Sequence, residues 1–273
     1  MNSIKVQNRI LPKAKLPFNL VKGSVKEREL AAESCWNKFV DEFVKVKEPD
    51  INDYRKCINK ALEPNKVSYK VFPETNSDFY GSAGMDVKVE QCSMNKFFIN
   101  YTNHKIGLPI DKDGKILVKS TAVHEARHLF DNLYQPKTTL LRTQHINDTP
   151  EFDAYTYNLW DTVVGTVRDK FDEKEFQTEV NEILSELPHD IAIETLQDCR
   201  YAIQSERRAY YSEILYLIKE NPIGNINRLK NAYRNFKNCN FNERESYITE
   251  KLKNLIAEER NNIKTNTNKK PEK

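Results

Sequence analysis

The segment His124-Glu125-Ala126-Arg127-His128 places two histidines four residues apart, with a glutamate directly after the first. An apolar stretch, Ile116-Leu117-Val118, precedes it, and Leu129-Phe130 follows it. This pattern predicts a helix that begins near Lys119 and ends before Pro136. Residues four apart lie one turn above each other on a helix, so both imidazoles should point to the same side.

This arrangement suits the binding of a zinc ion. A ring nitrogen of His124 and one of His128 can both reach one ion, at about 2.0–2.1 Å each. Glu125 would lean into the same cleft, where it can hold and deprotonate a zinc-bound water whose pKa the ion lowers to about 7. The sequence therefore predicts His124 and His128 as metal ligands and Glu125 as the catalytic base.

A catalytic zinc usually has three protein ligands, so a third is expected beyond the loop that follows the motif helix. The candidates there are Glu151, Asp153 and His145. Glu151 shares a helix face with the small Ala154, which would let two helices approach closely. The apolar stripe of the same helix is centred nearer to Asp153, so the residues alone leave the choice open. His145 is also a candidate for stabilising an oxyanion or donating a proton.

The pairing of His124-Glu125-x-x-His128 with Glu151-x-x-Ala154 resembles the gluzincin branch of zinc metallopeptidases. In that branch the glutamate of Glu-x-x-Ala is the third zinc ligand, so the resemblance implies Glu151, with Asp153 as the alternative. It also implies a zincin-like catalytic domain that hydrolyses peptide bonds. The resemblance covers roughly residues 85–165 and is specific for the metal site alone.

The rest of the chain predicts an α+β protein, in which a small mixed sheet and an active-site helix precede a helix-rich C-terminal half. Alternating apolar residues predict strands between about 66 and 103, and a fourth short strand near 115–118. The resemblance implies that the strand Lys96 to Asn103 forms the sheet edge, where an extended substrate can pair, and the alternative is an ordinary strand of the sheet. A helix should run from Thr149-Pro150-Glu151 to about Phe171.

These patterns suggest four segments. They are an irregular N-terminal arm, a zincin-like catalytic domain, a helical C-terminal subdomain packed on it and a disordered basic tail, at residues 1–23, 24–172, 173–262 and 263–273.

Composition excludes some classes of protein. The formal net charge is only +3 and the basic residues are spread along the chain, which argues against nucleic-acid binding. No long apolar run predicts a membrane span, and the N-terminus lacks the apolar core of a signal peptide. The five cysteines form no Cys-x-x-Cys pair, as is typical of a reducing compartment. We expect a cytoplasmic protein, or an effector or toxin-type protease delivered into a host cytosol.

The sequence thus predicts a zinc metalloendopeptidase whose partner is a protein or peptide substrate. The alternative is an interaction protein that binds metal in a peptidase-like site but does not catalyse hydrolysis. The intact Glu125 favours the enzyme, because a binding protein needs no base at that position. The sequence predicts neither a particular substrate nor an oligomeric state.

Overall fold

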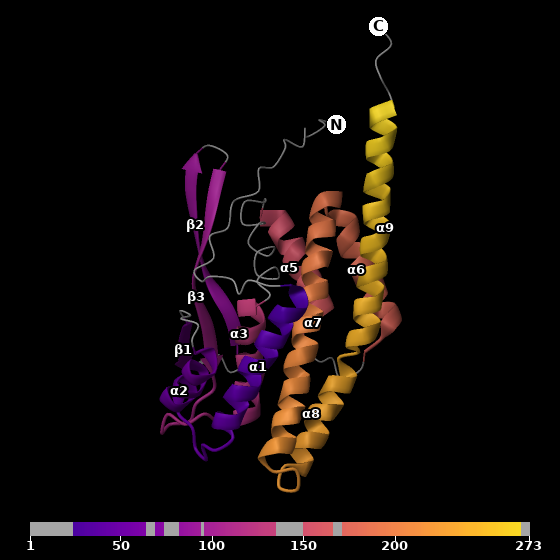
Figure 1. Cartoon of the computed structure of the whole chain (residues 1–273). Coiled ribbons are helices and arrows are strands. Elements are labelled where there is room, and N and C mark those ends of the chain that lie inside the picture. The colour runs from indigo at the N-terminus through magenta and orange to yellow at the C-terminus, as the bar shows by residue number, and fades with distance from the viewer. Residues whose placement is uncertain are drawn as a thin grey trace. The chain divides into compact units, whose positions relative to one another are not determined.

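A computed structural model describes residues 24–63, 69–73, 82–93, 96–134, 150–165 and 171–268 (Figure 1). The chain divides into two compact units, Met1–Gln144 and His145–Lys273. The sequence predicted a boundary after residue 172, whereas the division into compact units falls before the helix at 150–164, whose buried Leu159 and Val163 belong to the core of the second unit. The predicted arm at 1–23 lies outside the described residues.

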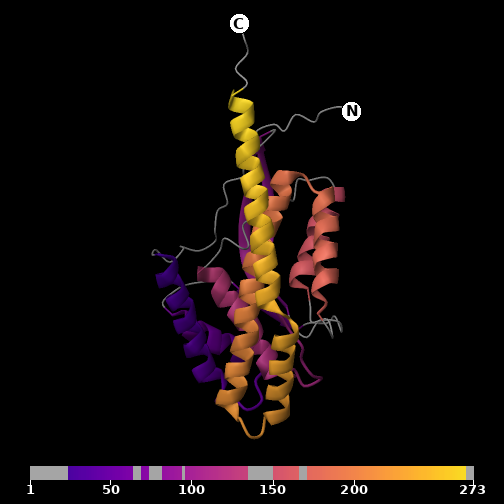
Figure 2. The ribbon, with the colours of Figure 1, turned by 90° about the vertical axis from the view of Figure 1, so that its right-hand side faces the viewer.

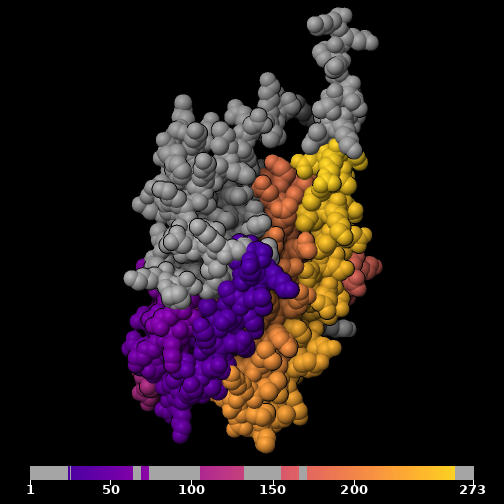
Figure 3. Space-filling view, in the orientation of Figure 1, coloured from indigo at the N-terminus to yellow at the C-terminus, as the bar shows by residue number. Residues whose placement is uncertain are grey.

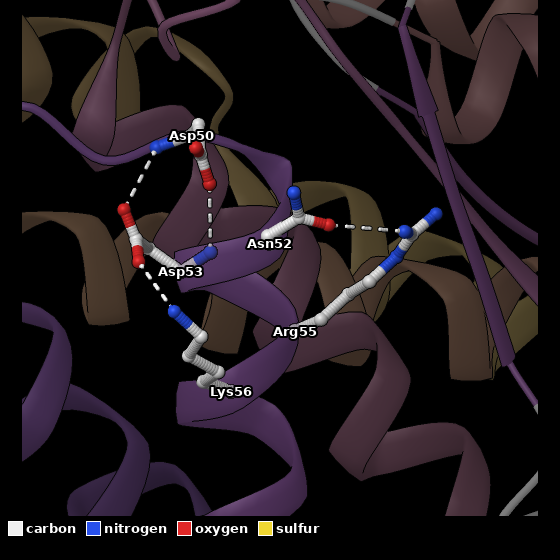
Figure 4. Close-up of polar contacts among 5 residues, drawn as sticks. All are labelled: Asp50, Asn52, Asp53, Arg55 and Lys56. Carbon is white, nitrogen blue, oxygen red and sulfur yellow. Dashed lines mark hydrogen bonds and ion pairs between the residues drawn. The ribbon is translucent and has the colours of Figure 1, made fainter.

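The first unit contains three helices, α1 (Val25–Phe43), α2 (Ile51–Leu62) and α3 (Lys119–Tyr134). Two of them begin at capping boxes, in which a side chain and a backbone N–H satisfy each other across the first turn. Ser24 and Glu27 form the box of α1, and Asp50 and Asp53 form that of α2 (Figure 4). The three helices share an aromatic core, whose rings lie 5.1–6.0 Å apart and belong to Phe39, Phe43, Tyr54 and Phe130.

The sheet of this unit is mixed and has three strands, β1 (Tyr69–Pro73), β2 (Ser82–Ser93) and β3 (Lys96–Leu108), in the order β1-β3-β2. β3 pairs in parallel with β1 through His104–Leu108 and antiparallel with β2 along most of its length. β3 is therefore central where β1 pairs with it, over His104–Leu108, which lies beyond the predicted edge segment Lys96–Asn103. Among the described strands, Lys96–Asn103 pairs with β2 alone.

The predicted fourth strand near 115–118 does not form a ladder. Lys115 and Ile116 instead make isolated bridges to Asp50 and Ile110. The backbone N–H of Ile116 donates to Pro49 O at 2.8 Å. These contacts connect the segment before α3 to the segment before α2.

The second unit consists, in its described part, of the helices α5 (Pro150–Val164), α6 (Glu173–Glu186), α7 (His189–Glu220), α8 (Ile226–Asn238) and α9 (Phe241–Asn268). α7 is the long central helix of this unit, and α8 and α9 lie beside it in both ribbon views (Figures 1 and 2). The apolar side chains of α5, α6, α7 and α9 meet in one core that includes Leu159, Val180, Leu196, Ile203 and Ile248.

Two helix ends differ from the sequence prediction. α5 stops at Val164 instead of near Phe171, and the next residue is Gly165, a residue type that often follows the end of a helix. α9 continues to Asn268 and so includes part of the predicted disordered tail at 263–273. With a small mixed sheet and many helices, the described chain is of the α+β class.

Candidate metal centre

Helix α3 is attached to other segments of the first unit by two hydrogen bonds between a side chain and a backbone carbonyl. The hydroxyl of Tyr54 in α2 donates to Ala122 O at 2.9 Å, inside the core. The ammonium of Lys119 donates to Val46 O at 2.8 Å, after the end of α1. Ala122 and Ala126 are fully buried, and their small side chains let α3 lie close to its neighbours. These contacts therefore hold α3 in place in the turn that precedes His124.

The two histidines face each other closely. His124 Nε2 and His128 Nε2 are 3.2 Å apart, and the ring planes are inclined by 70°. Two nitrogens bound to one tetrahedral zinc at about 2.0–2.1 Å would lie about 3.3 Å apart. The observed separation therefore fits a shared ion, although a hydrogen bond between two neutral imidazoles has a similar length. His124 and His128 can hold a metal ion, and their geometry does not distinguish zinc from other ions that imidazole binds.

The two histidines are more exposed than the residues around them on α3. Both are half-buried, while the residues between Ala122 and Asp131 are otherwise buried. Glu125 is 6% exposed. Burial, and to a smaller extent the negative charge of Glu125, raises the pKa of Tyr54 well above its usual value. The carboxylate of the predicted base thus lies near the buried hydroxyl that holds α3.

Arg127, which lies within the motif, is buried and paired with acids. Its Nε donates to Asp131 Oδ1 at 3.1 Å, and its guanidinium also bonds Glu33 of α1. The guanidinium lies 5.9 Å from the ring centre of Trp36, also on α1. This cluster couples the motif helix to α1.

The sequence pattern did not identify Glu33 or Trp36 as neighbours of Arg127, because they lie more than 90 residues before it in the chain.

The other predicted site residues belong to the second unit. Glu151 and Asp153 lie in the first turn of α5, but their side chains are outside the described part of the chain. His145 also lies outside the described residues. The structure therefore brings His124 and His128 together and places Glu125 on the same helix, and the third ligand stays a prediction.

A comparison of the chain with known protein families, curated protein sequences and solved structures found no match in any of the three. Among the described residues, no helix combines the length and apolar composition that crossing a bilayer requires.

Proposed function

We propose that this protein is a zinc-dependent metallopeptidase that hydrolyses peptide bonds of a protein substrate. The observation that carries the proposal is the 3.2 Å separation of His124 Nε2 and His128 Nε2 on the helix that also carries the buried Glu125. Two imidazoles and a carboxylate are the groups that a hydrolytic zinc site requires from its main helix. The resemblance to gluzincins supports the same reading.

In this proposal His124 and His128 hold the ion through their Nε2 atoms. Zinc held there would supply a Lewis acid and lower the pKa of a water that it binds to about 7. Glu125 accepts the proton that the attacking water loses and passes it to the nitrogen of the leaving amine. A buried carboxylate suits this role, because nearby apolar groups keep bulk water from competing for the proton.

Glu151 is the proposed third ligand, because its segment Glu151-x-x-Ala154 resembles the segment that supplies the third zinc ligand in gluzincins. Asp153 and His145 are the alternatives that the sequence leaves open. A hydrolytic zinc needs one more protein ligand and one open position, so only one of these three should be required.

The segment Lys96–Asn103 of β3 is the proposed site of substrate backbone pairing. Among the described strands it pairs on one side only, with β2, because β1 accompanies β3 just along His104–Leu108. A strand with one side unpaired offers backbone N–H and C=O groups to an extended peptide. Main-chain pairing there would orient a peptide without selecting its sequence.

Substituting Glu125→Gln tests the catalytic role. Wild-type protein loaded with zinc is incubated with a peptide library from a digested proteome, and new termini are counted by mass spectrometry. We expect Glu125→Gln to keep the zinc but to lose activity by a factor on the order of a hundred or more, because an amide cannot accept the proton. Glu48→Gln, an exposed change in the same unit, is the matched control and should cleave like the wild type.

Two outcomes would overturn the proposal. Undiminished cleavage by Glu125→Gln would contradict the assignment of the base. Stoichiometric zinc with no cleavage by the wild type would favour a metal-binding interaction protein. The double variant His124→Ala/His128→Ala should lose zinc while its far-ultraviolet circular dichroism stays unchanged. That result would show that zinc binding depends on the two histidines and that its loss is not caused by unfolding.

The third ligand can be identified by comparing zinc affinities. Glu151→Gln, Asp153→Asn and His145→Ala are each titrated with zinc against a competing chelator. We expect Glu151→Gln alone to weaken binding, by a factor on the order of ten to a hundred, as loss of one ligand contact should. Weakening in one of the other two variants, with Glu151→Gln unaffected, would reassign the ligand.

A further inference from the structure

The turn between α7 and α8 contains an isoleucine whose side chain is almost fully exposed. Ile223 is 86% exposed, and Ile218 and Ile226 on either side of it are 46% and 47% exposed. An aliphatic side chain this exposed at the tip of a turn contributes nothing to the core of its own unit. In the space-filling view the orange end of α7 and α8 forms the lower tip of the second unit (Figure 3).

Hydrogen bonds within the turn stabilise its backbone. Gly224 N–H donates to Asn221 Oδ1 and Asn225 N–H donates to Asn221 O, both at 2.9 Å. A Cβ on Gly224 would lie 2.5 Å from Asn221 Nδ2, so a larger residue would displace the amide that bonds this turn. The backbone around Ile223, between Pro222 and Gly224, is therefore constrained, and docking onto a partner would cost little backbone ordering entropy.

The charge around the turn has one sign. Residues 221–242 contain four basic and no acidic residues, although the whole chain has nearly equal numbers of both. The basic side chains are all exposed on α8 and belong to Arg228, Lys230, Arg234 and Lys237.

The nearest acidic residue before the turn is Glu220, and its carboxylate already accepts hydrogen bonds from other residues of this unit. One of its oxygens accepts from Tyr216 OH at 2.7 Å and the other from Asn225 Nδ2 at 3.2 Å. The exposed side chains of the turn and α8 therefore present cations without a neighbouring free carboxylate from this stretch.

We propose that the α7–α8 turn and the exposed face of α8 dock onto an anionic lipid bilayer. Exposed isoleucines beside a cluster of cations match the boundary between acyl chains and anionic headgroups. Tyr233 is 53% exposed on the same helix and has the apolar ring and polar hydroxyl that suit this boundary. A nucleic acid could bind the cations through its phosphates and stack a base on the tyrosine, but it offers no apolar surface for the aliphatic side chains.

Flotation of the full-length protein with vesicles tests the proposal. We expect binding to vesicles of phosphatidylcholine and phosphatidylserine, and none to phosphatidylcholine alone. Each cation near such a surface contributes about fivefold to binding. Neutralising Arg228, Lys230, Arg234 and Lys237 to glutamine should therefore weaken binding on the order of several hundredfold. Ile223→Ser should weaken it about tenfold by removing the inserted side chain.

The matched control neutralises four exposed lysines of the first unit, Lys26, Lys38, Lys47 and Lys112. It changes the net charge equally and should bind vesicles like the wild type. Glu125→Gln should also bind normally, so failure of the peptidase proposal would leave this one intact.

Three results would overturn the proposal. They are no vesicle binding by the wild type, an equal loss of binding in the control, and wild-type binding by Ile223→Ser, which would leave only nonspecific charge attraction. Tight binding of single-stranded DNA that is lost in the α8 variant, without vesicle binding, would assign the surface to nucleic acid instead.

Discussion

At the scale of single residues, the hydroxyl of Tyr54 links α2 to the helix that carries the two histidines. It is fully buried and donates to Ala122 O at 2.9 Å. Its pKa is raised by burial and by the nearby charge of Glu125, so the hydroxyl keeps its proton throughout the working pH range. The bond therefore persists wherever the predicted base is ionised.

Removing this hydroxyl gives a prediction for stability. Tyr54→Phe should lower the free energy of unfolding of the first unit by about 1 kcal/mol, because one buried hydrogen bond is lost while the ring packing stays. The measurement is urea unfolding followed by Trp36 fluorescence in a Trp160→Phe background, since these two are the only tryptophans and each unit has one. Tyr211→Phe, at an exposed position, should show no change.

At the scale of elements, the start of α2 depends on a reciprocal pair of carboxylates. Asp50 accepts from Asp53 N–H at 2.8 Å, and Asp53 accepts from Asp50 N–H at 3.4 Å and from Lys56 at 3.2 Å (Figure 4). The backbone N–H groups of the first turn, Asp53 above all, lower the pKa of Asp50 below its ordinary value of 3.8. α2 in turn supplies the tyrosine that holds α3.

The lowered pKa fixes the sign of a pH effect. A carboxyl whose pKa is lower in the folded state stabilises that state above its unfolded pKa, and the contribution is lost as pH falls through the folded value. Asp50→Ala should lower the free energy of unfolding by about 1 kcal/mol at neutral pH. This difference from the wild type should shrink below pH 3.8.

Urea unfolding over a pH series measures this effect. Asp50→Asn is the matched control, since asparagine caps a helix about as well but does not titrate. A difference between Asp50→Ala and the wild type that stayed constant through the acid range would show that the charge of Asp50 contributes nothing.

At the scale of the whole molecule, the second unit has its own buried cation. Arg244 of α9 donates to Val163 O and Gly165 O, both at 3.2 Å, and so satisfies carbonyls at the end of α5. Its guanidinium lies 5.2 Å from the ring centre of Phe171 and 5.7 Å from that of Phe176. One side chain therefore joins α5, α6 and α9 within this unit.

Because the chain forms two compact units, damage to one should not spread to the other. Arg244→Met should destabilise the second unit by about 2–3 kcal/mol, since hydrogen bonds from a buried charged group are lost. The transition reported by Trp160 in a Trp36→Phe background should shift, while that of Trp36 in the reciprocal background should not. Arg260→Met, at an exposed position of α9, is the control. Equal shifts in both transitions would show that the units unfold as one.

Much of the local structure could be predicted from the sequence. The bounds of α3 agree with the predicted helix to within two residues, because apolar spacing is a local signal. Burial of Cys35, Cys57, Cys199 and Cys239 without disulfides also agrees with the cysteine pattern. The end of α5 was missed, because apolar spacing continues past Val164 and does not mark where a helix stops. The parallel pairing of β1 with β3 was not predicted, since strand order depends on pairing between distant segments.

For the candidate site, the pairing of the two histidines follows from the sequence alone. His124 and His128 are four residues apart, and the helical repeat places their side chains on one side without help from the rest of the chain. The contacts of Tyr54, Lys119, Glu33 and Trp36 that hold this helix in place follow only from the tertiary structure. These contacts join segments up to 94 residues apart, and such pairs arise from how helices pack, which no local pattern encodes.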